Sequence, residues 1–175
     1  MSSDQDKALL EITDLCIDGF SNNRWHQIVR HVNLRIDRGG ILGLIGESGA
    51  GKSTIGIAAM GYAKPGCRIT QGSIKFENFE LTTATEEEKR ILRGSRIAYV
   101  AQSAAASFNP AHKLIDQFSE CVVQHGIGSR EQAYADAKEL YNRIKMPDPN
   151  RIGFRYPHQV SGGQLQRAMT AMALS

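Results

Sequence analysis

A glycine-rich run in the first third of the chain constrains the fold more than any other feature. Residues 46–54 read Gly-Glu-Ser-Gly-Ala-Gly-Lys-Ser-Thr and match the pattern G-x-x-x-x-G-K-[ST] in full. An uninterrupted apolar run, Ile41 to Ile45, stands directly before it and predicts a strand that is buried on both faces. A strand, a glycine-rich turn and a helix in succession are the context that a phosphate-binding loop needs. The sequence therefore predicts an α/β fold built around such a loop.

The residue types of this run suit phosphate chemistry. Glycines take positive φ and let successive backbone N–H groups face one concavity, and the helix that follows directs its positive end to the same place. We expect Lys52 to bring a cation to the β- and γ-phosphates, and Ser53 to offer a hydroxyl to Mg²⁺, which prefers hard oxygen ligands. The predicted phosphate-binding residues are Gly46, Glu47, Ser48, Gly49, Ala50, Gly51, Lys52, Ser53 and Thr54.

Bulk composition narrows the class of protein. The net charge of +3 is too small to indicate nucleic acid, so no nucleic-acid partner is expected. The three cysteines have no CxxC spacing, which argues against a zinc site or a disulfide framework and fits a reducing, cytoplasmic setting. The polar start of the chain is not a secretory signal, and no stretch approaches the about 18 consecutive apolar residues of a spanning helix. We therefore expect any association with a membrane to be peripheral.

Periodicity predicts the remaining elements. Strands are expected over Leu9 to Asp18, around the alternating Val32, Leu34 and Ile36, at an edge position around Ile74 and Phe76, and, buried, over Ile97 to Ala101. Helices are expected after Lys52, over Glu86 to Leu92, around Ile115, Phe118 and Val122, and around Ala133, Ala137, Leu140, Tyr141 and Ile144. The sequence thus changes from mixed strands to a helical insert at about Gln102.

A second run with anion-binding character lies near the end of the sequence. Ser161 is a good N-cap for a helix whose apolar face carries Leu165, Ala168, Met169 and Met172. The Ser-Gly-Gly stretch at the start of that helix leaves backbone N–H groups open to an anion. Alone this signal is weak, because turns and linkers use the same residues.

Together the two motifs resemble those of the ATP-binding subunits of ABC transporters, from Leu9 to Ser175. The run from Gly46 to Thr54 matches the Walker A motif, and Gln102, after a predicted strand, matches the Q-loop glutamine. The signature motif is matched by Ser161, Gly162, Gly163 and Gln164, with Val160 where leucine is usual. By the same resemblance Phe20 is the aromatic residue that stacks on adenine, and Trp25 is the competing candidate.

The resemblance implies a P-loop NTPase core with an antiparallel β subdomain, an inserted α-helical subdomain and, in this chain, an incomplete core sheet. The implied boundaries are 1–101 for the β subdomain and Walker A part, 102–159 for the helical insert with the Q-loop, and 160–175 for the signature and its helix. The implied ligands are ATP and Mg²⁺, with Ser53 and Gln102 at the metal and Gln102 acting in catalysis. The sequences around Phe108 and Pro157 are similar to those of the dipeptide, oligopeptide and nickel importers.

The same resemblance implies partners. Two ATPase domains of this family meet head to tail, so Ser161 and Gly163 are expected to face an ATP held by a second ABC ATPase domain, identical or different. The helical insert is expected to meet transmembrane permease subunits at the cytoplasmic face of the membrane. A solute-binding protein would be linked to the chain only indirectly.

Hydrolysis in this family also uses a Walker B strand that ends in Asp-Glu and a later histidine, and neither follows the signature helix here. We therefore expect the 175-residue chain to bind ATP without turnover, and interpret it as a piece of a longer ATPase in preference to a natural short form. A catalytically inactive module that only docks on a membrane partner is the main alternative. A repair-type ATPase is disfavoured because no heptads lie between the motifs, and a GTPase because no Asn-Lys-x-Asp motif is present.

Overall fold

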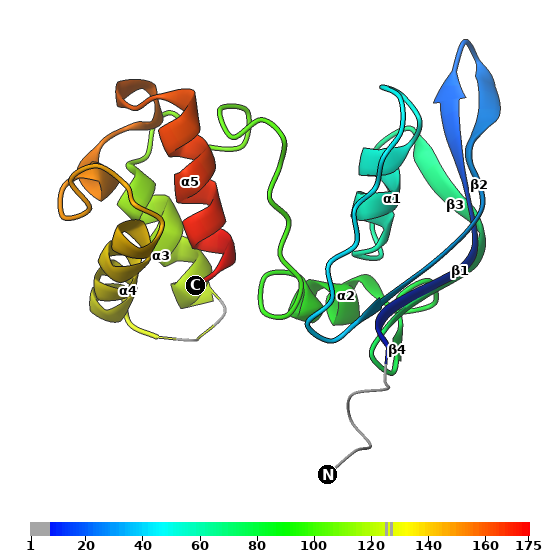
Figure 1. The fold of residues 1–175 in the computed structure, drawn as a ribbon, viewed down its shortest axis with the longest axis horizontal. Coiled ribbons are helices and arrows are strands. Elements are labelled where there is room, and N and C mark those ends of the chain that lie inside the picture. The colour runs from blue at the N-terminus through cyan, green and yellow to red at the C-terminus, as the bar shows by residue number, and fades with distance from the viewer. Residues whose placement is uncertain (1–7, 125, 127) are drawn as a thin grey trace. The chain divides into compact units, whose positions relative to one another are not determined.

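The computed structural model describes residues 8–124, 126 and 128–175. It contains two compact units, of which the first ends at Ile91 and the second begins at Leu92 (Figure 1). The first unit holds the strands and two short helices, and the second is helical. Among the described residues, no helix is both long and apolar enough to cross a membrane. The domain boundaries at 101/102 and 159/160 stay predictions.

The sheet of the first unit is antiparallel throughout. Its strands are β1 (Ala8–Ser21), β2 (Arg24–Asp37), β3 (Cys67–Phe76) and β4 (Phe79–Glu80), in the order β2-β1-β3-β4. β1 and β2 form a hairpin because Asn22 and Asn23 both take positive φ, 49° and 58°, which suits the right-handed twist of the flanking strands. The predicted strands around residues 9–18, 32–36 and 74–76 are confirmed, although β3 pairs on both sides and is not an edge strand.

All three long strands are irregular near their middle. β1 shifts register against β2 and β3 between Ile12 and Ile17. Opposite the shift, Gly72 has φ 102°, and a Cβ there would lie only 2.6 Å from the carbonyl oxygen of Asp14. A glycine is therefore required where the backbones of β1 and β3 approach most closely.

The core of the first unit is mainly aliphatic. Side chains of the sheet and of the helix α1 (Lys52–Ala58) are buried, whereas the charged helix α2 (Glu86–Leu92) has no buried residue. The buried members include Ile12, Leu15, Ile17, Val29, Ile57, Ile74, Phe76 and Leu81. The helix predicted over Glu86 to Leu92 is confirmed at both ends.

The second unit is a small helical bundle with its own core. Its helices are α3 (Leu114–Gln124), α4 (Arg130–Arg143) and α5 (Gly162–Ala173), with single 3₁₀ turns η1 (Ile152–Phe154) and η2 (Pro157–Gln159). Phe118 is fully buried and meets Tyr141 edge to face, with ring centroids 6.1 Å apart. The predicted apolar faces of α3 and α4 are confirmed, since they form this core together with α5.

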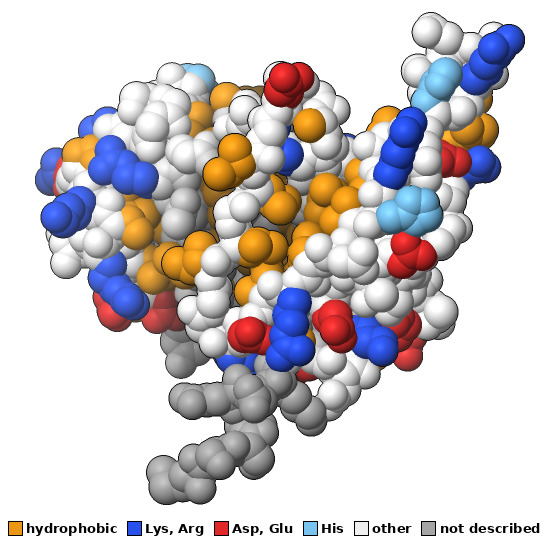
Figure 2. All heavy atoms as spheres, turned by 45° about the vertical axis from the view of Figure 1, so that its right-hand side comes forward, with side chains coloured by type: hydrophobic (Ala, Val, Ile, Leu, Met, Phe, Trp, Pro, Cys, Tyr) orange, Lys and Arg blue, Asp and Glu red, His pale blue; other side chains and the backbone are white. Residues whose placement is uncertain are grey.

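Two predicted buried strands do not form, and this part of the sequence interpretation is wrong. Ile41 and Ile45 are 100% exposed, and Tyr99 and Val100 are 45% and 39% exposed. A parallel strand is stable only when neighbouring strands satisfy its backbone and cover its faces. Among the described residues no strand pairs with either segment, and an isolated bridge joins Arg93 to Ile97. Figure 2 shows apolar side chains at the molecular surface.

Candidate functional site

The glycine-rich run forms a loop that leads directly into α1. Gly49 and Gly51 take positive φ of 85° and 82°, and Gly51 is the N-cap of the helix. The loop is closed by hydrogen bonds from the Ala50 N–H to the Glu47 oxygen (3.2 Å) and from the Ile55 N–H to the Gly51 oxygen (2.9 Å). The predicted turn-to-helix junction is thus present, although the segment before it has no regular secondary structure.

A close approach to β2 fixes the position of Gly51. A Cβ at this residue would lie 3.2 Å from both the Ile28 carbonyl oxygen and the Val29 Cγ2. Because φ is also positive there, any side chain would add backbone strain to this steric crowding. The glycine-rich loop is therefore seated against β2 at Ile28 and Val29.

Lys52 folds back over the loop that precedes it. Its Nζ donates to the carbonyl oxygens of Gly46, at 2.7 Å, and Glu47, at 2.5 Å. The ammonium group is held at the start of the loop, and the side chain of Ser53 is exposed at the first turn of α1. A cation, a hydroxyl and backbone N–H groups therefore converge on one loop, which is the donor set that a magnesium-bound phosphate chain needs.

An aromatic pair lies at the hairpin end of the same sheet. Phe20 and Trp25 are register partners on β1 and β2, with ring centroids 5.2 Å apart and an interplanar angle of 56°. Both rings are open to solvent, with Phe20 50% and Trp25 42% exposed. Sequence reasoning missed Arg68, whose Cζ lies 4.1 Å over the Trp25 ring, because it comes from β3, with no local signal to connect it.

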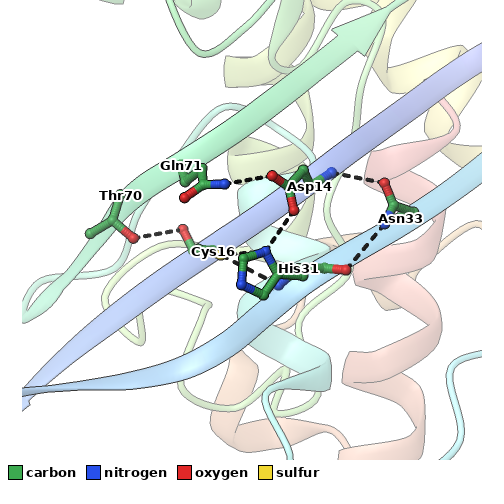
Figure 3. Close-up of polar contacts among 6 residues, drawn as sticks. All are labelled: Asp14, Cys16, His31, Asn33, Thr70 and Gln71. Carbon is green, nitrogen blue, oxygen red and sulfur yellow. Dashed lines mark hydrogen bonds and ion pairs between the residues drawn. The ribbon is translucent and has the colours of Figure 1, made fainter.

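Hydrogen bonds between polar side chains connect the strands in the irregular middle of the sheet (Figure 3). The Asp14 carboxylate meets His31 Nδ1 at 2.7 Å and also accepts from the Gln71 amide, while the Asp14 N–H donates to Asn33 Oδ1 at 2.9 Å. The hydrogen bond with His31, followed by that with Gln71, lowers the pKa of Asp14. This network ties β1 to both neighbouring strands at the bulge.

The Cys16 thiol beside this network is not arranged for nucleophilic catalysis. Its Sγ lies 3.7 Å from His31 Nδ1, the same ring nitrogen that meets Asp14. An imidazole that activates a thiol needs one nitrogen for the thiol proton and the other for the carboxylate. The network is therefore structural.

The signature segment of the second unit begins α5 as predicted. The Gln164 N–H donates to Ser161 Oγ at 3.3 Å, and the Ser161 N–H donates to Gln164 Oε1 at 2.8 Å, which completes a capping box. Gly162 and Gly163 are exposed, and a Cβ at either would meet nothing within 4 Å. The first N–H groups of a helix have no acceptor within it, so this end of α5 presents donors to solvent.

Gln102 is exposed and lies in irregular chain, not at the end of a strand. The residue before it is held by α5, because Gln166 Nε2 donates to the Ala101 carbonyl oxygen at 3.0 Å. Sequence reasoning missed Gln166, since the two residues are 65 positions apart. Within the second unit, the signature helix therefore positions the chain that carries Gln102.

Most of the chain matches one known protein family. Residues 29–175 match the family model described as ABC transporter. The chain belongs to the ABC transporter family. The dipeptide transport ATP-binding protein DppD of Haemophilus influenzae is 34% identical over 96% of the chain and 51% of its own length. The oligopeptide transport ATP-binding protein OppD of Bacillus subtilis is 36% identical over 95% of the chain and 47% of its own length.

The share of the relative's own length that the chain covers varies among other similar proteins. The glutathione import ATP-binding protein GsiA of Salmonella typhimurium is 35% identical over 97% of the chain and 28% of its own length. The chain thus spans about half or less of these curated relatives. A dimeric ATP-binding cassette, MJ0796, solved in a post-hydrolysis state with ADP and Pi, aligns with a TM-score of 0.82 at 23% identity, over 94% of this chain and 68% of its own. The fold is that of an ABC cassette.

The predicted site residues fall into two groups. The Walker A residues and Phe20 belong to the first unit, whereas Gln102 and the signature residues belong to the second. Each group has the local geometry described above, and the roles of its members in nucleotide binding stay predictions.

Proposed function

We propose that this chain is the nucleotide-binding part of an ABC importer ATPase and that it binds MgATP at the loop of residues 46–54. The observation that carries the proposal is the placement of the Lys52 ammonium inside the start of that loop. The ammonium and the loop N–H groups would neutralise the β- and γ-phosphates, and the exposed hydroxyl of Ser53 would ligate Mg²⁺. Magnesium supplies charge neutralisation between the phosphates when it is bound.

The second group of residues would act on a nucleotide held by another copy or a related subunit. Ser161 and the open N–H groups of Gly162 and Gly163 would bind its γ-phosphate, because a helix N-terminus favours an anion. Gln102 would contact the metal or the attacking water. The dimeric state of the ATP-binding cassette with a similar fold supports this division of roles.

The transported solute is proposed to be a peptide or a related small compound. The support is the set of similar proteins, whose names describe dipeptide, oligopeptide and glutathione import. In this proposal the chain works at the cytoplasmic face of the membrane through permease subunits, and ATP hydrolysis by the complete ATPase drives transport. A solute-binding protein would act on the permease and not on this chain.

Substitution of Lys52 tests nucleotide binding directly. We expect Lys52→Ala to abolish measurable MgATP binding by the chain in isothermal titration calorimetry, because the loop loses its only ammonium group and the charge that offsets the phosphates. The matched control is Lys64→Ala, which removes an equal charge from an exposed lysine of the same unit. Equal affinity of Lys52→Ala and wild type, or equal losses in both variants, would refute the proposed site.

A further inference from the structure

We propose that Arg68 is a positioning residue for the nucleobase: it caps one face of Trp25 and leaves Phe20 as the ring that receives the base. This inference rests on the proposed nucleotide binding and adds a residue from a third strand to that site. It also decides between the two aromatic candidates that the sequence leaves open.

Arg68 is held in place from two sides. Its Nη2 lies 3.1 Å from Asp18 Oδ2, and the two residues are register partners on β3 and β1. The same guanidinium lies 4.1 Å from the centre of the Trp25 ring. A planar guanidinium can pair with a carboxylate and lie on an aromatic face together, whereas an ammonium group is a less suitable substitute.

Because the Arg68 guanidinium covers a face of Trp25, Phe20 is the better ring for stacking with a nucleobase. The guanidinium covers one face of the Trp25 indole. The Phe20 ring packs against the same indole, with ring centroids 5.2 Å apart and an interplanar angle of 56°. Phe20 remains 50% exposed. A flat base can therefore stack on Phe20 without displacing the Arg68 guanidinium, while Trp25 supports the Phe20 ring from behind.

β2 connects the aromatic pair with the glycine-rich loop, because it carries Trp25 and also contacts Gly51. Trp25 is three residues along this strand from Ile28, whose carbonyl oxygen lies 3.2 Å from the Cβ position at Gly51. At about 3.3 Å per residue, the two features are separated by about 10 Å of strand. A ribose and a phosphate can bridge that span. Figure 1 shows the loop before α1 and the hairpin end of β1 and β2 at the same end of the first unit.

The test separates base recognition from phosphate recognition. Calorimetric titrations with MgATP and with magnesium tripolyphosphate are compared for wild type, Arg68→Met and Lys75→Met, an exposed control on the same strand. We expect Arg68→Met to weaken MgATP binding about two- to fivefold, as loss of an exposed cation–π contact implies. Tripolyphosphate binding should be unchanged, and Lys75→Met should behave as wild type. Arg68→Lys should restore part of the loss.

Aromatic variants identify the receiving ring. We expect Phe20→Leu to weaken MgATP binding about five- to a hundredfold and Trp25→Leu to weaken it less. Arg68→Met should cause no further loss in the Trp25→Leu background, because Arg68 acts through that ring. Trp25 is the only tryptophan of the sequence, so its emission should respond to MgATP and not to tripolyphosphate.

Three results would overturn the inference. They are an unchanged MgATP affinity in Arg68→Met, an equal loss for MgATP and tripolyphosphate, and a larger effect of Trp25→Leu than of Phe20→Leu. A wild-type chain that binds neither ligand would refute the proposed function itself, and the inference with it. Normal tripolyphosphate binding that depends on Lys52, with no effect of Arg68, would refute only the inference.

Discussion

At the scale of single residues, glycines stand where a side chain would clash with a neighbouring backbone. Gly72 lies against the Asp14 carbonyl oxygen across the bulge, and Gly51, within the glycine-rich loop, lies against the Ile28 carbonyl oxygen. At Ser161, in contrast, a side chain is required, because its hydroxyl accepts the hydrogen bond of a helix N–H group that has no acceptor within the helix. Gly51 and Ser161 each fix a segment that the proposed site uses, whereas Gly72 fixes the bulge of the sheet.

Asp14 makes the stability of the sheet depend on pH. Hydrogen bonds from His31 and Gln71 lower the pKa of its carboxyl below the ordinary value of 3.8. A lowered native pKa means that the stabilisation is present above pH 3.8 and is lost as the pH falls through the lowered value. We expect wild type to exceed Asp14→Asn in free energy of unfolding at pH 7, and the difference to shrink below pH 3.8, in urea titrations.

The exposed Asp136 of α4 provides the control for this experiment. Asp136→Asn should leave the pH dependence of unfolding close to that of wild type. A constant difference between wild type and Asp14→Asn across the acid range would show that the Asp14 carboxylate does not stabilise the sheet.

At the scale of elements, α5 supports more than its own capped end. Gln166 holds the Ala101 carbonyl oxygen, and Arg167 Nη1 donates to the Lys145 carbonyl oxygen at 2.7 Å, beyond the end of α4. The signature helix thus orders two irregular segments of its unit. The Gln166 contact holds the residue directly before Gln102, so it gives α5 a role in placing Gln102.

Loss of the Gln166 donor should loosen the chain around Gln102. Gln166→Leu removes the hydrogen bond to Ala101 and is expected to destabilise the chain segment around Gln102 by about 1 kcal/mol. Hydrogen exchange followed by mass spectrometry should show faster exchange around residues 101–104, with α5 protected as before. Gln166→Glu is the matched variant, since it keeps the size and polarity but cannot donate when ionised. Exchange rates equal to those of wild type in both variants would contradict this role.

At the scale of the whole molecule, the chain contains two units with separate cores. Among the residues that the structure describes, the core of the sheet unit and the core of α3, α4 and α5 have no member in common. Phe118 is 0% exposed at the centre of the helical core. Stability is therefore expected to differ between the units, as it does between separate cooperative parts of many proteins.

Truncation of Phe118 tests this organisation. We expect Phe118→Ala to destabilise the helical unit by about 3–5 kcal/mol and to raise hydrogen exchange in α3, α4 and α5, while β1 keeps its protection. Phe154→Ala removes a side chain that is 45% exposed and should have a much smaller effect. Equal loss of protection in β1 and in the helices would show that the two units unfold together.

Several features depend only on local chemistry and can be predicted from the residues alone. The glycine-rich loop before α1, the capped start of α5 and the apolar faces of α3 and α4 follow from residue types at short spacing, so they were predicted. The family follows from the same motifs, and the match over residues 29–175 confirms it.

Tertiary structure decided the features that join distant parts of the chain. The Ile41 to Ile45 run has the composition of a buried strand, but a strand needs neighbours, and none of the described strands pairs with it. Arg68 reaches Trp25, and Gln166 reaches Ala101, only because the sheet register and the helix packing bring them together. Local patterns state what a segment can form, whereas long-range hydrogen bonds and side-chain contacts decide what it does form.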